Sequence, residues 1–170
     1  MTVTIVIPAR APRTAKTRLR GALGPADRAR LALAMLDDVV VAAVATGWPV
    51  LVVTDAPSIA ARARRSGARA MVVAARGTRD GARRGATRAL RDGADAVLIV
   101  AADVPCVRPA DLRRIAAAGR NHGVVIVPDR RRSGTNALYL RPPSRMSPRF
   151  GSGSFAAHRS AAGADGRVLA

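Results

Sequence analysis

A basic loop follows the first apolar run of the sequence and carries the only lysine of the chain. Val3–Ile7 predicts a β-strand, and Arg10, Arg13, Lys16 and Arg18 come soon after it. Because open α/β sheets bind phosphorylated ligands at the carboxyl ends of their strands, these cations could neutralise the phosphates of a nucleotide. The alternative is a solvated, charged loop, since arginine is abundant along the whole chain.

The carboxylate of Asp103 follows the most apolar stretch of the chain. Ala96–Val100 predicts a central strand, so Asp103 is expected at the carboxyl edge of the sheet. Mg²⁺ prefers carboxylate oxygens and bridges them to substrate phosphates, which makes Asp103 a candidate metal ligand. An aspartate that caps its own loop through nearby backbone amides is an equally good interpretation of this position.

Two segments rich in glycine and hydroxyl side chains are candidates for holding a second anionic group. Gly134–Leu138 opens a predicted strand, and Arg149–Phe155 is a glycine-serine turn before a predicted helix. Amides at the start of a helix point toward an anion, and glycine lets a phosphate approach the backbone closely. The alternative is a flexible turn in which Ser154 serves only as an N-cap.

Other residues suited to metal or nucleophilic chemistry are few. His122 and His158 have no partner at metal-ligand spacing, and both are expected at the surface. The lone Cys106 excludes an internal disulfide and a cysteine-based zinc site, and it is expected to be buried as a small apolar residue. The spacing indicates no Ser-His-Asp triad.

The composition is that of a globular chain with a large positive charge. The chain has 170 residues, 49% of them hydrophobic and 2% aromatic, so aliphatic side chains must build the core. No apolar run reaches the roughly 20 residues of a membrane span, and the start of the chain does not resemble a signal peptide, so a cytoplasmic protein is expected. The net charge of +18 suggests nucleic-acid binding. The arginines are nevertheless scattered, without a basic arm or interleaved aromatics, so nucleic acid is not expected as the main partner.

Strands and helices are expected to alternate along the chain. Short apolar runs predict strands at 2–7, 49–53, 69–73, 96–100, 124–127 and 137–140. Helices are expected at 25–45, 109–118 and 155–162. Two more are expected between these, a short one that ends near residue 67 and one that ends at residue 91. This alternation predicts an α/β fold of three layers, α/β/α, with a mostly parallel sheet. We expect one domain over 1–170, with a Pro-, Gly- and Ser-rich segment at 142–154 and a frayed or truncated carboxyl end.

Several of these segments together resemble the family of 2-phospholactate and phosphoenolpyruvate guanylyltransferases. The resemblance spans residues 3–160, and it is carried, in order, by Ile7–Arg10, Ala15–Leu19, Ala32–Leu36, Ala102–Pro105, Pro128–Arg130, Gly134–Leu138 and Arg149–His158. Its most specific part is the pair Gly-Thr-Asn-Ala-Leu and Phe-Gly-Ser-Gly-Ser-Phe.

The resemblance implies a nucleotidyltransferase with the GT-A-like fold of the nucleotide-diphospho-sugar transferases. Such enzymes join GMP from GTP to 2-phospholactate or phosphoenolpyruvate, release pyrophosphate and serve the biosynthesis of coenzyme F-420. The residues that the resemblance assigns are Arg10, Arg13, Lys16 and Arg18 for the nucleotide, Thr135, Gly151 and Ser154 for the acceptor, and Asp103, with Lys16 and Arg18, for catalysis. By the same resemblance, Asp103 is the ligand of a Mg²⁺ cofactor.

The chain departs from the family pattern at three places. Arg10 stands where the family usually has lysine, and Gly77–Arg79 replaces a Gly-Leu-Asn sequence that helps to hold the nucleotide. The family's Asp-x-Asp-Thr-Pro motif does not occur before Ala170, and Asp165 is the only acid after Asp129. These departures leave two alternatives open. One is a catalytically impaired paralogue that binds nucleotide or a partner, and the other is a transferase of the same fold with another phosphoacid or nucleotide.

Overall fold

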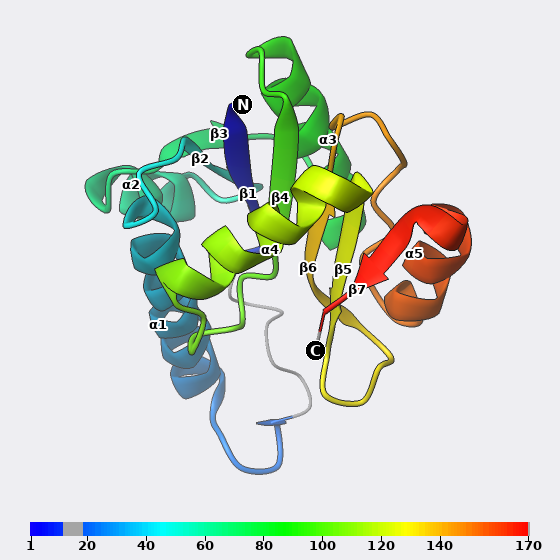
Figure 1. Cartoon of the computed structure of the whole chain (residues 1–170). Coiled ribbons are helices and arrows are strands. Elements are labelled where there is room, and N and C mark those ends of the chain that lie inside the picture. Colours follow the sequence, from blue (N-terminus) through cyan, green and yellow to red (C-terminus); the bar gives the residue numbers. More distant parts are fainter. Residues whose placement is uncertain (12–18, 170) are drawn as a thin grey trace.

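The computed structural model of the chain describes residues 1–11 and 19–169. These residues form one sheet with helices on both sides (Figure 1). The strands are β1 (Val3–Ala9), β2 (Val50–Thr54), β3 (Arg69–Val72), β4 (Ala96–Val100), β5 (Val124–Pro128), β6 (Thr135–Leu140) and β7 (Gly166–Val168). The helices are α1 (Pro25–Val44), α2 (Pro57–Arg65), α3 (Thr78–Arg91), α4 (Pro109–His122) and α5 (Ser154–Ala162), with a 3-10 turn, η3 (Gly163–Asp165).

The seven strands are ordered β3-β2-β1-β4-β6-β5-β7 in the sheet. All neighbouring pairs are parallel except those of β6, which runs antiparallel to both β4 and β5. The three-layer α/β/α architecture with a mostly parallel sheet is therefore confirmed. Strand β7, which pairs with β5, was not predicted by the sequence.

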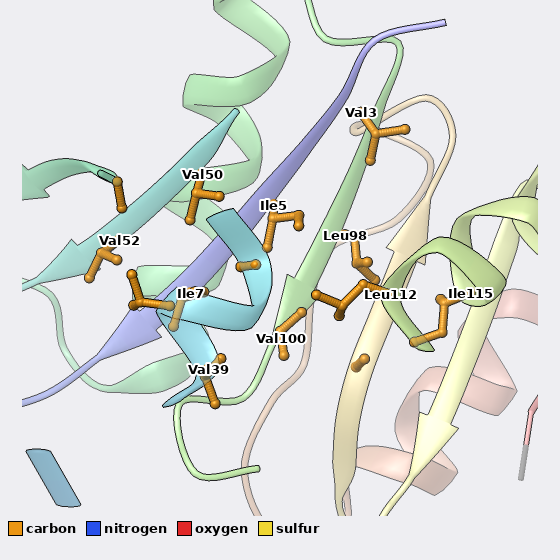
Figure 2. Packing of buried hydrophobic residues seen from close by; sticks show 14 of the residues in the cluster. Val3, Ile5, Ile7, Val39, Val50, Val52, Leu98, Val100, Leu112 and Ile115 are labelled. Carbon is orange, nitrogen blue, oxygen red and sulfur yellow. The ribbon is translucent and has the colours of Figure 1, made fainter. Parts of the chain in front are cut away.

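Different helices cover the two faces of the sheet. Because successive strand residues point to opposite faces, Ile5 and Ile7 of β1 pack with α1, α2 and α4, whereas Val6 packs with α3. In Figure 1, α4 crosses the near face of the sheet and α3 lies behind it. Each face has its own hydrophobic core. Figure 2 shows the core on the face of α1, α2 and α4, where Val39 of α1 and Leu112 of α4 pack onto the strand residues. Aliphatic side chains thus fill most of both cores, as the composition predicts.

Helix α3 lies very close to β1 because glycine occupies its sheet-facing side. A Cβ atom at Gly85 would lie 2.3 Å from Cγ1 of Val6, well inside van der Waals contact. Further along the same face, a Cβ atom at Gly81 would lie 3.3 Å from Cβ of Pro8. This close packing places the start of α3, at Thr78, beside the carboxyl end of β1.

The direction in which the chain fills the sheet reverses at β1. After β1, the chain adds β2 and β3 on one side, and it then returns to place β4 on the other side of β1. Such a reversal leaves a crevice at the carboxyl ends of the two strands, where open α/β sheets bind ligands. Here the crevice lies beyond Ala9 of β1 and Val100 of β4, so that Arg10 and Asp103 both follow strands that end at it.

Two further expectations concern the surface. None of the described helices is both long enough and apolar enough to cross a membrane. Cys106 is exposed, so the expectation that it is buried was wrong. It lies in the turn between β4 and α4, and connecting turns run over the protein surface, where their backbone groups can reach water.

Candidate active site

A cavity of about 230 Å³ opens at the reversal point of the sheet. The end of β1 contributes Arg10 and the segment after β4 contributes Asp103, while Thr78 comes from the start of α3. Leu33 and Leu36 of α1 form part of an apolar wall. An apolar wall with a few charged and polar groups at its edge is the usual construction of a small-molecule site.

The charged groups of the basic loop are only partly within the described residues. Arg10 is exposed at the cavity, and the next residue is tied to the segment that follows β2, because the backbone N–H of Ala11 donates to Oδ1 of Asp55 (2.9 Å). Arg13, Lys16 and Arg18 lie outside the described residues. The predicted proximity of Arg10 and Asp103 follows from parallel pairing of β1 and β4, since both strands end at one edge of the sheet.

Asp103 is the carboxylate that the described part of the cavity offers to a cation. Its side chain is exposed, and no three His, Cys, Asp or Glu side chains of residues 1–11 and 19–169 cluster as a ready-made metal site. Mg²⁺ usually keeps several waters and takes one or two carboxylates together with substrate phosphates. An exposed carboxylate at the edge of this cavity fits that mode of binding, and it does not fit a closed site made only of protein ligands.

A second group of polar residues lies at the same sheet edge, on the other side of β4. Because β6 runs antiparallel to β4, the amino end of β6 lies beside the carboxyl end of β4, and the N–H of Ala101 donates to the carbonyl of Asn136 (2.8 Å). Thr135, the first residue of β6, is buried, and its Oγ1 lies 2.9 Å from Nδ1 of His158 in α5. The tertiary structure thus brings together the two glycine- and hydroxyl-rich segments that the sequence singled out.

The turn before α5 is shaped by glycine. Gly151 has φ +125° and Gly153 has φ +69°, and L side chains rarely adopt such backbone conformations. The N-cap of α5 is Gly153, so the alternative interpretation of Ser154 as the N-cap was wrong. Ser154 is 1% exposed, and its Oγ has no hydrogen-bond partner among the described residues. A buried hydroxyl without a partner is costly, so this group is available to a further hydrogen-bond partner at the turn.

The loop that leads into Thr135 is held by Asp129. Its carboxylate accepts hydrogen bonds from the backbone N–H of Ser133 (2.8 Å) and from the Ser133 hydroxyl (3.0 Å). Hydrogen bonds from the backbone of Gly134, and then of Ser133, hold the pKa of Asp129 below its ordinary value. The N–H of Phe155 in α5 also donates to the carbonyl of Ser133 (3.4 Å), so this loop and the start of α5 are joined directly.

His158 belongs to this polar group, which sequence reasoning did not predict. It is fully buried, so the expectation that it lies at the surface was wrong. Burial, and to a smaller extent the positive charges of Arg149 and Arg79, together lower the pKa of His158 from 6.5 to about 4. Arg79 follows Thr78, which lines the cavity, so the start of α3 lies between the cavity and the polar group around His158. The ring is therefore a neutral hydrogen-bonding group, and it lies in the polar group that adjoins the cavity.

The sequence is similar to known transferases over nearly the whole chain. Residues 3–167 match the model of the family described as "Guanylyl transferase CofC like". The phosphoenolpyruvate guanylyltransferase of Sphaerobacter thermophilus is 40% identical over 171 residues, which cover 99% of this chain and 83% of the relative. That of Rubrobacter xylanophilus is 43% identical over 164 residues, covering 95% of this chain and 80% of the relative.

Solved structures with the same fold are much more distant in sequence. A protein of Desulfovibrio desulfuricans assigned to the nucleotide-diphospho-sugar transferases has a TM-score of 0.79 at 14% identity, covering 99% of this chain and 80% of its own. A nucleotidyl transferase from Methanothermobacter has a TM-score of 0.64 at 22% identity, covering 92% and 80%. A Mycobacterium tuberculosis protein solved in complex with manganese has a TM-score of 0.56 at 20% identity, covering 99% and 88%. The predicted nucleotide-diphospho-sugar transferase fold is confirmed by these likenesses.

The family match and the curated relatives extend over nearly the whole chain, and the cavity lies where enzymes of this fold class bind their ligands. This chain therefore belongs to the CofC-like guanylyltransferase family, and it is a nucleotidyltransferase.

Proposed function

We propose that this enzyme transfers GMP from GTP to phosphoenolpyruvate, with release of pyrophosphate, as a step in the biosynthesis of coenzyme F-420. The main support is the set of curated relatives that are 34% to 43% identical to this chain, all of which are named phosphoenolpyruvate guanylyltransferases. The site adds physical support, since it offers a cavity at the sheet edge where this fold class binds ligands, and a separate polar turn. 2-Phospholactate, which carries the same phosphate and carboxylate, is the competing acceptor.

GTP occupies the cavity at the reversal point of the sheet in this proposal. The base and ribose lie against the apolar wall from α1, and the phosphates lie toward Arg10 and the loop that carries Arg13, Lys16 and Arg18. Asp103 holds Mg²⁺, which supplies neutralising charge to the nucleotide phosphates when it is bound. Cations around a transferred phosphoryl group lower the barrier because negative charge spreads over its oxygens in the transition state.

The acceptor binds at the turn before α5, between Thr135, Gly151 and Ser154. The buried Oγ of Ser154, which has no partner among the described residues, gains one when an acceptor oxygen arrives. The positive φ angles of Gly151 and Gly153 shape the turn. No other atom lies within 4 Å of the position that a Cβ would take at either glycine. A phosphate and a carboxylate offer several acceptor oxygens and no donors, so hydroxyl groups of this turn suit them well.

The reaction needs no protein nucleophile. A phosphate oxygen of the acceptor attacks the α-phosphorus of GTP, and the bond from that phosphorus to the bridging oxygen of the β-phosphate breaks. Pyrophosphate leaves with the electron pair of that bond. The residues of this chain contribute by holding the attacking oxygen in line with the leaving oxygen, which converts a bimolecular encounter into a positioned one.

The test is pyrophosphate release by the chain with GTP, Mg²⁺ and each phosphoacid in turn, with the products identified by mass. We expect guanylylated phosphoenolpyruvate as the main product. Asp103→Asn should lower kcat/KM by on the order of 10²-fold or more, the usual effect of removing a group that stabilises transition-state charge. Asp38→Asn is the matched control, because Asp38 is an exposed aspartate in the middle of α1.

The outcomes separate the parts of the proposal. A product formed only from 2-phospholactate would change the acceptor and leave the reaction standing. Full activity of Asp103→Asn would remove the metal-binding role of Asp103. A folded wild-type protein that guanylylates neither acid would refute the proposed reaction.

A further inference from the structure

His158 joins the two segments that face the acceptor. Its Nδ1 lies 2.9 Å from Oγ1 of Thr135 at the start of β6, and its Nε2 accepts a hydrogen bond from the backbone N–H of Arg149 (2.8 Å). The ring is fully buried, and it forms a T-shaped pair with the Phe150 ring, with 5.3 Å between ring centroids. Both ring nitrogens are therefore held and Phe150 packs against the ring, which leaves the imidazole a single orientation.

These contacts determine which nitrogen of His158 carries the proton. A backbone N–H can only donate, so the Nε2 atom that faces Arg149 must be the unprotonated, accepting nitrogen. A neutral imidazole has one N–H, which must then be on Nδ1. Nδ1 is consequently the donor, and Oγ1 of Thr135 is the acceptor, in the contact between the two side chains.

The tautomer of His158 in turn decides what Thr135 offers to a ligand. A hydroxyl group has one proton and two lone pairs, and here one lone pair is already occupied by the Nδ1–H of His158. The proton of the Thr135 hydroxyl must then point to another partner. With the opposite tautomer, the hydroxyl would donate to Nδ1 and would present only lone pairs to an incoming ligand. Lone pairs repel the oxygens of a phosphate or a carboxylate, whereas an O–H group binds them.

We propose that His158 is a positioning residue of the acceptor site, which fixes Thr135 as a hydrogen-bond donor toward the phosphoacid and ties the Arg149–Gly153 turn to β6. The role of Thr135 in binding the acceptor rests on the proposed function, whereas the tautomer of His158 does not. His158 itself contacts no substrate. It acts through Thr135 and through the backbone of Arg149.

The tautomer can be observed directly in the wild-type protein. The chain contains two histidines, so the imidazole correlations of His158 in ¹⁵N-labelled protein are assigned by comparison with His122→Gln. We expect the two-bond ¹H–¹⁵N pattern of a ring with its proton on Nδ1 throughout the range from pH 6 to pH 8. A ring with its proton on Nε2, or a ring that exchanges between tautomers, would overturn the inference whether or not the protein has transferase activity.

Two substitutions separate the two hydrogen bonds of His158. The amide of His158→Asn ends close to the position of Nδ1, so it can still donate to Thr135. The amide of His158→Gln reaches farther, to the position of Nε2, so it can still accept from Arg149 but loses the bond to Thr135. We expect His158→Gln to raise the Kd and the KM for phosphoenolpyruvate about tenfold, while the KM for GTP stays within about twofold. His158→Asn should recover most of that loss.

Thr135→Val supplies the control, because it removes the hydroxyl that His158 is proposed to orient. In that background, His158→Gln should add little further loss of phosphoenolpyruvate binding, since both changes remove the same interaction. Three results would each show a merely structural role of His158. These are equal losses of phosphoenolpyruvate affinity in His158→Asn and His158→Gln, a matching loss of GTP affinity, and full additivity of His158→Gln with Thr135→Val. If a variant does not fold, the tautomer measured in the wild-type protein still tests the inference, because the wrong tautomer would overturn it. Binding without guanylylated product would refute the proposed reaction alone, since the binding comparison remains valid.

Discussion

Acidification from pH 7 to pH 5 should destabilise this protein through His158. The ring is fully buried and its pKa is lowered from 6.5 to about 4, so it stays neutral in the folded protein at pH 5. In the unfolded chain the same ring is mostly protonated at pH 5. Between these two pKa values the unfolded state binds more protons, so the free energy of unfolding falls as the pH falls. The stabilisation is complete above about pH 6.5 and is lost as the pH approaches 4.

The size of the effect follows from the two pKa values. At pH 5, which lies about 1.5 units below the pKa of the unfolded ring, protonation of the unfolded state lowers the free energy of unfolding by about 2 kcal/mol. This follows from roughly 1.4 kcal/mol per pH unit. Carboxylates contribute little in this window, because the pKa values of Asp129 and Asp80 are lowered, that of Asp80 to about 2. Their stabilising contribution is present above the unfolded pKa of about 4 and is lost only as the pH falls below it.

Urea unfolding at pH 7 and pH 5 measures the effect. The wild-type protein should lose about 2 kcal/mol in the free energy of unfolding, with an unchanged m-value. His158→Asn, which has no titrating ring, should lose much less over the same interval. His122→Gln, which removes an exposed histidine at the end of α4, should behave as the wild type does. An equal loss in the wild type and in His158→Asn would refute the reasoning.

Two other predictions concern a close contact and the acceptor turn. Gly119→Ala should cost about 1–3 kcal/mol of stability by chemical denaturation, because overpacking at a buried contact forces its neighbours to move; the new Cβ would lie 2.1 Å from the buried Tyr139 ring. The control is Gly21→Ala, where a Cβ meets nothing within 4 Å, and equal stability of the two variants would contradict the packing argument. Ser154→Ala should raise the KM for phosphoenolpyruvate about tenfold without lowering the melting temperature, because the lost hydroxyl has no partner among the described residues. A lower melting temperature with an unchanged KM would show that Ser154 serves the fold and not the acceptor.

The sequence by itself determined the order of the elements from β1 to α5 and the edge of the sheet that carries the site. Short apolar runs between turn signals define strands locally, since side-chain alternation and burial depend on residues within the run. Once β1 and β4 are placed in one parallel sheet, their carboxyl ends must meet at one edge. Arg10 and Asp103 therefore lie at one cavity, as the sequence predicts. The motifs at Thr135 and Ser154 could likewise be found from their residue types alone.

Only the tertiary structure decided what His158 does. Along α5 it stands among small and polar residues, a context that predicts an exposed side chain. Its burial depends on partners that are 23 and 9 residues away in the chain, Thr135 and Arg149. No local pattern encodes such partners, because a buried polar ring is favourable only where donors and acceptors from other elements meet it.

The direction of β6 and the presence of β7 were also decided at the tertiary level. An apolar run such as Thr135–Leu140 is compatible with either strand direction, since side-chain alternation is the same in both. The short loop fixed by Asp129 returns the chain directly, so β6 pairs antiparallel with β5 and brings Thr135 to the active edge. Gly166–Val168 becomes a strand because it pairs with the free edge of β5. This pairing is a backbone interaction, and the side chains of a three-residue segment do not predict it.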